Sequence, residues 1–203
     1  GLAAPSLEVR HHPSGLNTRF NGSQLAFADY VALSRDMLNR AHSARGVTGL
    51  EKIVDGNAPF ELKPPAGFPS GQNKIYRRGV LLTHGLTNSP YFMRHLAAFF
   101  QENGFRVMAI LLPGHGTQPG DLLDATWQEW AKTVAYGCDR LAEEVDEVYL
   151  AGYSAGAALS LFHSLRDERV RGLLLFSPAL RITSQARFAN WHKWYSWLIP
   201  SAE

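Results

Sequence analysis

The chain has 203 residues, 45% of them hydrophobic and 19% charged, and its formal net charge at pH 7 is +2. This composition can bury a core, so it excludes extended disorder and predicts one globular domain. The balanced charge offers no basic face to a phosphate backbone, and we expect no nucleic-acid partner. The single cysteine, Cys138, excludes an intramolecular disulfide and a zinc site built on several thiolates within this chain.

Two further features concern membranes and compartment. No run of 18 apolar residues occurs, so we expect no membrane span in this chain. The sequence begins with Gly1 rather than Met, as it would if an upstream signal or anchor had been removed. The compartment is therefore left open between the cytoplasm and a periplasmic or membrane-associated location.

Residues 1–77 are predicted to form an extension that packs across the surface of the domain. Apolar side chains at helical spacing predict one amphipathic helix here; they are Tyr30, Leu33, Met37, Leu38 and Ala41. Residues 55–74 contain four prolines and three glycines, which predicts a long loop.

Residues 78–185 show the pattern of an α/β core. Four short apolar runs, at 79–83, 105–111, 147–151 and 172–176, lack polar alternation and predict the buried strands of a mostly parallel sheet with helices on both faces. One helix is expected between the cap Ser89 and Gly104, and a second begins at the capping box of Thr126 and Glu129. A third begins directly after Ser154 and runs to about Arg166.

The segment Gly152-Tyr153-Ser154-Ala155-Gly156 lies between a predicted strand and a predicted helix. A serine hydroxyl must be lifted clear of the sheet before a base can reach it, and a tight turn between a strand and a helix does so. We therefore predict that Ser154 is a nucleophile, with an ordinary Gly-Ser turn as the alternative.

A second candidate element is His84-Gly85-Leu86, at the end of the first core strand. Acyl transfer requires rigid amides that stabilise an oxyanion, and the N–H groups of Leu86 and Ala155 are the candidate pair. For the His84 side chain we favour a structural role, hydrogen bonded to a neighbouring carbonyl, over a catalytic one.

These residues resemble the α/β-hydrolases, and within them the bacterial carboxylesterase and monoacylglycerol lipase group, which includes serine aminopeptidase-like hydrolases. The resemblance covers residues 78–179 and rests on residues 81–87, 112–116, 122–130 and 152–156. It implies an α/β-hydrolase fold, Ser154 as nucleophile and Leu86 and Ala155 as donors of the oxyanion hole. It also implies that the loop 113–116 shapes the turn beside the site, and Tyr153 is predicted to contact the substrate.

The same resemblance implies that the acid and the histidine of a catalytic triad follow the nucleophile. The candidates after Ser154 are Asp167, Glu168, Glu203, His163 and His192, and none is predicted to reach it. The chain is therefore expected to be incomplete at its C-terminus, with the last strands, the acid and the histidine beyond residue 203.

Residues 186–203 are predicted to begin a cap or lid over the acyl pocket. Trp191, Trp194, Tyr195 and Leu198 form an apolar helical stripe, in which Trp191 and Trp194 are assigned to substrate binding. Ordinary core packing and a helix at a membrane interface are the alternatives.

The function predicted from the sequence is hydrolysis of carboxylic esters through an acyl-enzyme on Ser154, with a small-molecule ester or lipid as substrate. The alternatives are an amide or peptide hydrolase and a catalytically inactive binding protein of the same fold. No cofactor and no metal are expected, because the chemistry needs only a nucleophile and a base. The oligomeric state is left open.

Overall fold

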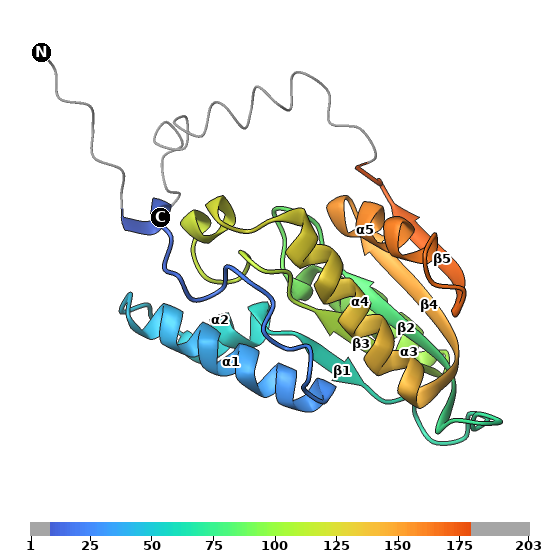
Figure 1. The fold of residues 1–203 in the computed structure, drawn as a ribbon. Coiled ribbons are helices and arrows are strands. Elements are labelled where there is room, and N and C mark those ends of the chain that lie inside the picture. Colours follow the sequence, from blue (N-terminus) through green and yellow to red (C-terminus); the bar gives the residue numbers. More distant parts are fainter. Residues whose placement is uncertain (1–8, 180–203) are drawn as a thin grey trace, which may run out of the picture.

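The protein is described by a computed structural model in which residues 9–179 are placed (Figure 1). Its sheet has five strands in the order β1-β3-β2-β4-β5. Their bounds are Phe60–Leu62 for β1, Tyr76–Thr83 for β2, Phe105–Ile110 for β3, Val145–Tyr153 for β4 and Val170–Phe176 for β5. Strands β2 to β5 are parallel and β1 pairs antiparallel with β3. The predicted fold class, a mostly parallel sheet, is confirmed.

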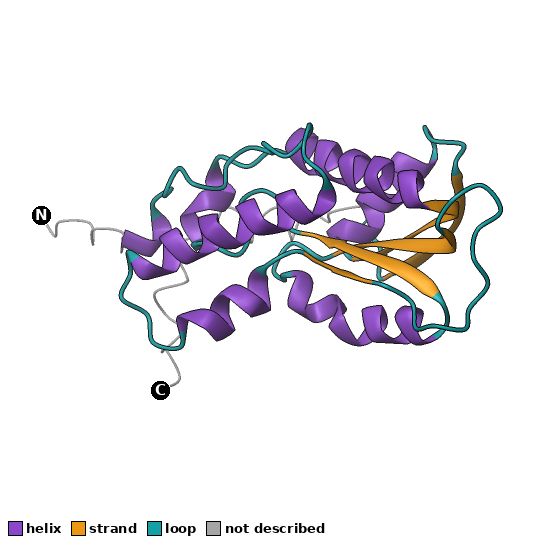
Figure 2. Ribbon diagram, turned by 90° about the horizontal axis from the view of Figure 1, so that it is seen from below, coloured by secondary structure: helices purple, strands orange, loops and turns teal. Residues whose placement is uncertain are grey.

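Helices cover both faces of this sheet, as Figure 2 shows. One face carries α3 (Arg94–Glu102), which follows the 3-10 turn η2 (Pro90–Met93), and the other carries α4 (Trp127–Glu144) and α5 (Ala155–Ser164). The remaining elements are η1 (Val9–His11), α1 (Phe27–Ser43), α2 (Leu50–Asn57) and η3 (Pro119–Leu123). No helix among the described residues is long and apolar enough to cross a membrane.

Successive residues of the central strands enter different cores, which explains why the middle of each strand is a run of apolar residues. Val80 and Leu82 of β2 pack with α3, whereas Leu81 between them packs with α4. Side chains alternate along a strand, and here both faces are covered, so polar residues have no favourable place.

The helix starts confirm most of the expected signals. Ser89 and Pro90 begin the helical segment as expected, although its first turn is 3-10, and Gly104 follows α3 in a left-handed conformation with φ of 83°. Thr126 Oγ1 accepts a hydrogen bond from Glu129 N–H at 3.4 Å. The Glu129 carboxylate does not complete the capping box, because it accepts instead from the Phe20 N–H at 2.9 Å.

The expectation of a loop over residues 55–74 is wrong in part. Its start belongs to α2, and β1 adds an edge strand to β3. Three residues are too few to show strand periodicity, and a long-range ion pair holds them: the buried Arg106 guanidinium binds Glu61 of β1 and Glu144 at the end of α4. The sheet therefore includes a strand from the segment predicted to be an extension.

Helix α1 confirms the predicted amphipathic helix, with one exception. Tyr30 is buried, and its hydroxyl donates to Leu111 O at 3.1 Å and accepts from Leu111 N–H at 3.0 Å. Leu33, expected on the apolar face, is 45% exposed. The predicted cap, residues 186–203 with Trp191 and Trp194, lies outside the described residues.

Candidate active site

Ser154 occupies the sharp turn between β4 and α5. Its backbone has φ of 53° and ψ of −113°, a conformation that residues with a side chain rarely adopt. The turn is held from the neighbouring strand, because Ser154 N–H donates to Phe176 O at 2.8 Å and Ala179 N–H donates to Ser154 O at 3.2 Å. This strained strand-to-helix turn is the geometry expected of a nucleophile elbow.

Two glycines make the turn possible. A Cβ on Gly152 would clash with the carbonyl of Gly156, and a Cβ on Gly156 would clash with the carbonyls of Thr83 and His84. Backbone atoms cannot swing aside as a flexible side chain can. The strand, the helix and the end of β2 therefore approach at a distance that only glycine permits.

The two amides assigned to the oxyanion hole lie on either side of this contact. Ala155 is the first residue of α5, so its N–H has no intrahelical carbonyl to bond and lies at the positive end of the helix dipole. Leu86 follows β2 in a loop packed against the elbow: a Cβ on Gly85 would lie 3.0 Å from Tyr153 Cδ1 and 3.4 Å from Ser154 Cβ. The fold thus brings the Leu86 loop next to Ser154.

His84 fixes the peptide unit that carries the Leu86 N–H. Its Nε2 accepts from Leu112 N–H at 3.0 Å, so the neutral ring carries its proton on Nδ1, which donates to Gly85 O at 2.8 Å. Burial, assisted by the neighbouring His115, lowers the pKa of His84 to about 3. The predicted bond to a neighbouring carbonyl is confirmed, and because C=O and N–H point in opposite directions in a trans peptide, it aims the Leu86 N–H away from His84.

Apolar side chains border Ser154. Leu86 is 40% exposed, Tyr153 43% and Phe176 42%, and Tyr153 and Phe176 are paired across β4 and β5. The surface beside the elbow is therefore apolar and open in the described part of the chain.

No histidine within residues 9–179 forms a hydrogen bond with Ser154 Oγ. His84 uses both ring nitrogens as described, and His163 donates from Nε2 to Asp167 Oδ2 at 3.0 Å. This last pair has the residue types of a triad, but His163 lies nine positions along α5, about 13 Å from Ser154. As predicted, it does not reach the nucleophile.

Cys138 joins that pair at the far end of α5, and one potential ligand atom from each of the three side chains lies within 4.8 Å of the others. Asp167 Oδ2 already accepts hydrogen bonds from His163 and, at 2.6 Å, from Arg169. The Arg169 guanidinium thus supplies the positive charge that a metal ion would bring. Burial raises the pKa of the Cys138 thiol to about 12, so the thiol stays protonated. This cluster is a hydrogen-bonded anchor for the turn between α5 and β5.

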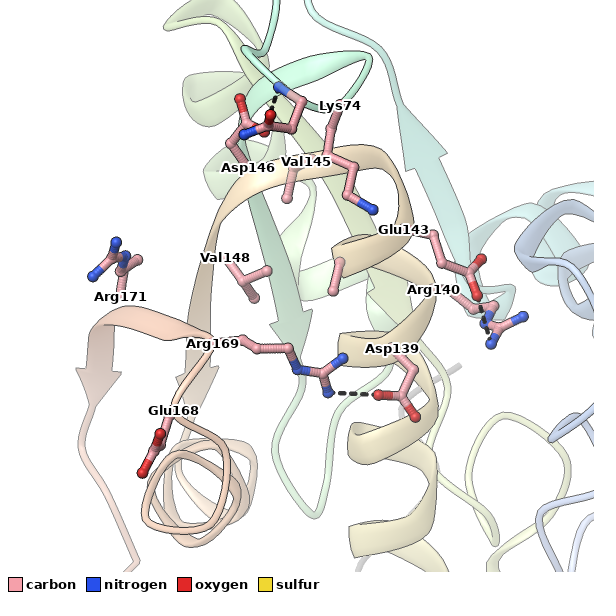
Figure 3. Close-up of a pocket in the computed structure, with 12 residues that line it drawn as sticks. Lys74, Asp139, Arg140, Glu143, Val145, Asp146, Val148, Glu168, Arg169 and Arg171 are labelled. Carbon is pink, nitrogen blue, oxygen red and sulfur yellow. Dashed lines mark hydrogen bonds and ion pairs between the residues drawn. The ribbon is translucent and has the colours of Figure 1, made fainter.

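A cleft of about 780 Å³ lies at the amino ends of β4 and β5, far from Ser154 (Figure 3). Charged side chains line it, and four of them form ion pairs: Arg169 binds Asp139 at 2.6 Å and Arg140 binds Glu143 at 2.8 Å. The length of β4 separates this charged cleft from the elbow, about 26 Å at 3.3 Å per residue. The candidate site is therefore identified by its backbone geometry and not by this cleft.

One contributor near the site was missed at the sequence level. His115 lies buried between Gly114 and Gly116, both with positive φ, and its Nε2 is 2.7 Å from Leu86 O. The sequence showed a Gly-His-Gly turn but not the partner of its side chain. The positive φ values explain why glycines flank His115. Only the tertiary contact with Leu86 O shows what the His115 side chain does.

Comparison with known proteins identifies relatives with esterase and lipase names. The family model Hydrolase_4, described as serine aminopeptidase, S33, matches residues 75–203. A thermostable monoacylglycerol lipase of Bacillus sp. (strain H-257) is 32% identical over 108 residues, 53% of this chain and 43% of that protein. A carboxylesterase of Bacillus subtilis (strain 168) is 32% identical over 85 residues, 41% of this chain and 35% of that protein.

Solved structures give a consistent result. One from a study of LipS and LipT, two metagenome-derived lipolytic enzymes, has a TM-score of 0.58 and 30% identity, covering 73% of this chain and 54% of that chain. Est1E from Butyrivibrio proteoclasticus, with ferulic acid bound, has a TM-score of 0.50 and 21% identity over 66% of this chain and 54% of that chain, and supports the fold alone. The matches span about half or less of the length of these relatives.

Proposed function

The chain belongs to the serine aminopeptidase S33 family of α/β-hydrolases, and on this premise we propose that the protein is a serine hydrolase that cleaves carboxylic esters. Ser154 is the proposed nucleophile, and the N–H groups of Leu86 and Ala155 are the proposed oxyanion donors. The names of the relatives, a monoacylglycerol lipase and a carboxylesterase, support the ester as the substrate class.

The observation that carries the proposal is the backbone of Ser154. A φ of 53° at a residue with a side chain is costly, and tertiary contacts from β5 and from the end of β2 maintain it. An ordinary turn has no need of this strain. It is explained if the turn exists to present the Ser154 hydroxyl above the sheet.

In the proposed reaction, Ser154 Oγ attacks the carbonyl carbon of the ester and loses its proton to a base outside the described residues. The carbonyl oxygen becomes an oxyanion that accepts hydrogen bonds from Leu86 N–H and Ala155 N–H. The intermediate collapses, the C–O bond to the alcohol breaks, and the base returns the proton to the leaving alcohol. Water then hydrolyses the acyl-enzyme by the same steps and restores the Ser154 hydroxyl.

The substrate is proposed to carry an apolar acyl group. Leu86, Tyr153 and Phe176 expose apolar surface beside Ser154 and would contact such a group. Tyr153 is thus proposed as a substrate contact, and Trp191 and Trp194 stay proposals of the same kind. The family description, an aminopeptidase, favours amide hydrolysis as the second candidate activity.

The test is covalent labelling of the full-length protein with a fluorophosphonate probe, together with hydrolysis of p-nitrophenyl acetate, p-nitrophenyl octanoate and an amino-acid p-nitroanilide. We expect label on Ser154, faster cleavage of the esters than of the anilide, and loss of both label and hydrolysis in Ser154→Ala. Faster cleavage of the anilide would favour the amide hydrolase. A folded wild-type protein without label or turnover would contradict the proposal and favour the inactive binding protein.

A further inference from the structure

We propose that Asn17 and His115 are positioning residues that hold residues 84–88, which we call the oxyanion loop because it carries the Leu86 N–H. Residues 12–20, which we call the strap, are therefore part of the catalytic apparatus. The strap lies outside residues 75–203, the segment that matches the family model. This inference rests on the proposed function, because it assigns Leu86 to the oxyanion hole.

The first step is the bond from His115 to Leu86. His115 is 5% exposed, and its Nε2 lies 2.7 Å from Leu86 O. Its Nδ1 also faces carbonyl oxygens, those of Leu112 at 3.2 Å and Pro113 at 3.1 Å. A carbonyl can only accept, so the ring must be the donor, and the shortest contact places its proton on Nε2.

This bond complements the one made by His84. His84 holds Gly85 O, on the amino side of Leu86, and His115 holds Leu86 O on the carboxyl side. The two rings pack edge-on at 4.8 Å between centroids. The backbone on both sides of the Leu86 N–H is thus fixed by neutral imidazoles, and burial lowers the pKa of His115 as well.

The second step is the bond from the strap to the His115 loop. Asn17 is 7% exposed; its side-chain Nδ2 donates to His115 O at 2.7 Å, and its backbone carbonyl accepts from Gly114 N–H at 2.5 Å. Glycines on both sides of His115 leave that backbone free to adopt other conformations. The loop therefore needs an external template, and the two bonds of Asn17 supply it.

The third step is the anchoring of the strap itself. Ser14 N–H and Oγ donate to the fully buried Asp121 at 2.5 Å and 2.7 Å, and Phe20 N–H donates to Glu129 at 2.9 Å. Asn17 lies between these two anchors, and Figure 1 shows the blue N-terminal segment running past the loops that precede α4 toward α1. The position of Asn17 is thus set by bonds on both sides of it, in addition to those that it makes to the His115 loop.

Displacing an oxyanion donor weakens the stabilisation of the transition state but leaves the binding of the substrate unchanged. An error of about 1 Å in such a group lowers the rate by about 100-fold, and loss of one donor by about 100- to 1,000-fold. A partly loosened loop is expected to show a smaller effect, about 10- to 100-fold in kcat, with KM within about twofold.

The experiment compares Asn17→Ala, His115→Leu and His115→Gln with the wild-type full-length protein. We measure kcat and KM for p-nitrophenyl octanoate and amide hydrogen exchange of the peptide that covers residues 84–88. Asn17→Ala and His115→Leu are expected to lower kcat about 10- to 100-fold and to speed exchange. His115→Gln is expected to recover much of kcat, because its side-chain amide can donate from near the Nε2 position.

Tyr136→Phe is the matched control. It removes a side-chain donor to another backbone carbonyl of the N-terminal region, Leu25 O at 3.1 Å, which lies away from the His115 loop. Its thermal midpoint is expected to fall as much as that of Asn17→Ala, with kcat and exchange unchanged.

Two outcomes separate this inference from the proposed function. If Ser154→Ala abolishes hydrolysis but Asn17→Ala and His115→Leu keep wild-type kcat and exchange, the inference is wrong and the proposed function stands. If the wild type shows no hydrolysis, the proposed function fails, and exchange then decides the inference: faster exchange in both variants supports the positioning role, and unchanged exchange overturns it.

Discussion

At the carboxyl ends of β2 and β4 three backbone segments touch one another, whereas at the amino ends of β4 and β5 charged side chains surround an open cleft (Figure 3). The first end contains Ser154, with the glycines Gly152 and Gly156 where a single methyl group would clash with a carbonyl. The second contains Arg169 and Asp139, an ion pair whose side chains are each about half exposed.

The two ends of the sheet differ in how well they tolerate substitutions. Backbone that touches backbone leaves no room for a rearrangement, so function at the elbow depends on steric exclusion and on fixed hydrogen bonds. Exposed ion pairs are screened by water, and their loss costs little. The sheet thus has one end with little tolerance for substitution and one tolerant end, and four substitutions test this contrast in descending order of effect.

The largest effect is expected from Gly156→Ala. The new Cβ would clash with the carbonyls of Thr83 and His84, so we expect a loss of more than about 4 kcal/mol in stability and no detectable hydrolysis. Gly56→Ala is the control, because its Cβ would meet only Tyr91 Cδ2, at 3.9 Å. Within a helix it is expected to be neutral or stabilising by up to about 1 kcal/mol. Urea unfolding measures both, and equal losses would contradict the steric explanation for Gly156.

The second prediction concerns the pH dependence of stability through His84. Because its folded pKa is about 3 and its ordinary value is 6.5, the unfolded chain binds a proton that the folded chain does not as the pH falls below 6.5. Stability is therefore lost as the pH falls, by about 3 kcal/mol between pH 7 and pH 4 from this group. Between pH 7 and pH 4 the non-titrating variant His84→Asn is expected to lose about 3 kcal/mol less stability than the wild type. Parallel stability curves would show that folding does not lower the pKa of His84.

The third prediction concerns an exception at the tolerant end, the anchor between α5 and β5, because its Asp167 side chain is only 9% exposed. Asp167→Asn weakens the bonds to Arg169 and His163 and is expected to lower stability at pH 7 by about 2 kcal/mol, with hydrolysis unchanged. The Arg169 guanidinium holds the pKa of Asp167 below its usual range, so this contribution is present above about pH 4 and lost at lower pH. A difference between wild type and variant that stays constant to pH 2 would contradict the assignment.

The smallest effect is expected from Glu143→Gln in the charged cleft. Its partner Arg140 lies three positions earlier on α4, at 2.8 Å, and the Glu143 side chain is 58% exposed. Such pairs contribute about 0.5 kcal/mol or less, and added salt should remove the difference. A thermal scan of both proteins at low and high ionic strength measures it, and a loss above about 1 kcal/mol would show that this end is less tolerant than described.

Much of the fold followed from local pattern. The strands β2 to β5 were predictable because continuous apolar runs mark strands buried on both faces, and the elbow was predictable because its two glycines and its flanks are adjacent in sequence. The edge strand β1 escaped prediction because three residues show no period. The exposure of Leu33 was not predicted, because helical spacing does not show how wide the buried face of the helix is.

The sequence by itself indicated the parallel strands β2 to β5 and the tight turn that carries Ser154, since each depends on residues close together in the chain. Only the tertiary structure decided which histidines hold the oxyanion loop and that Asn17 supports it, because Asn17 and His115 are 98 positions apart. A hydrogen bond between such distant residues leaves no periodic or steric trace in the sequence around either one. It exists because η3 and α4 anchor the strap beside the loop, and that arrangement is a property of the packed molecule.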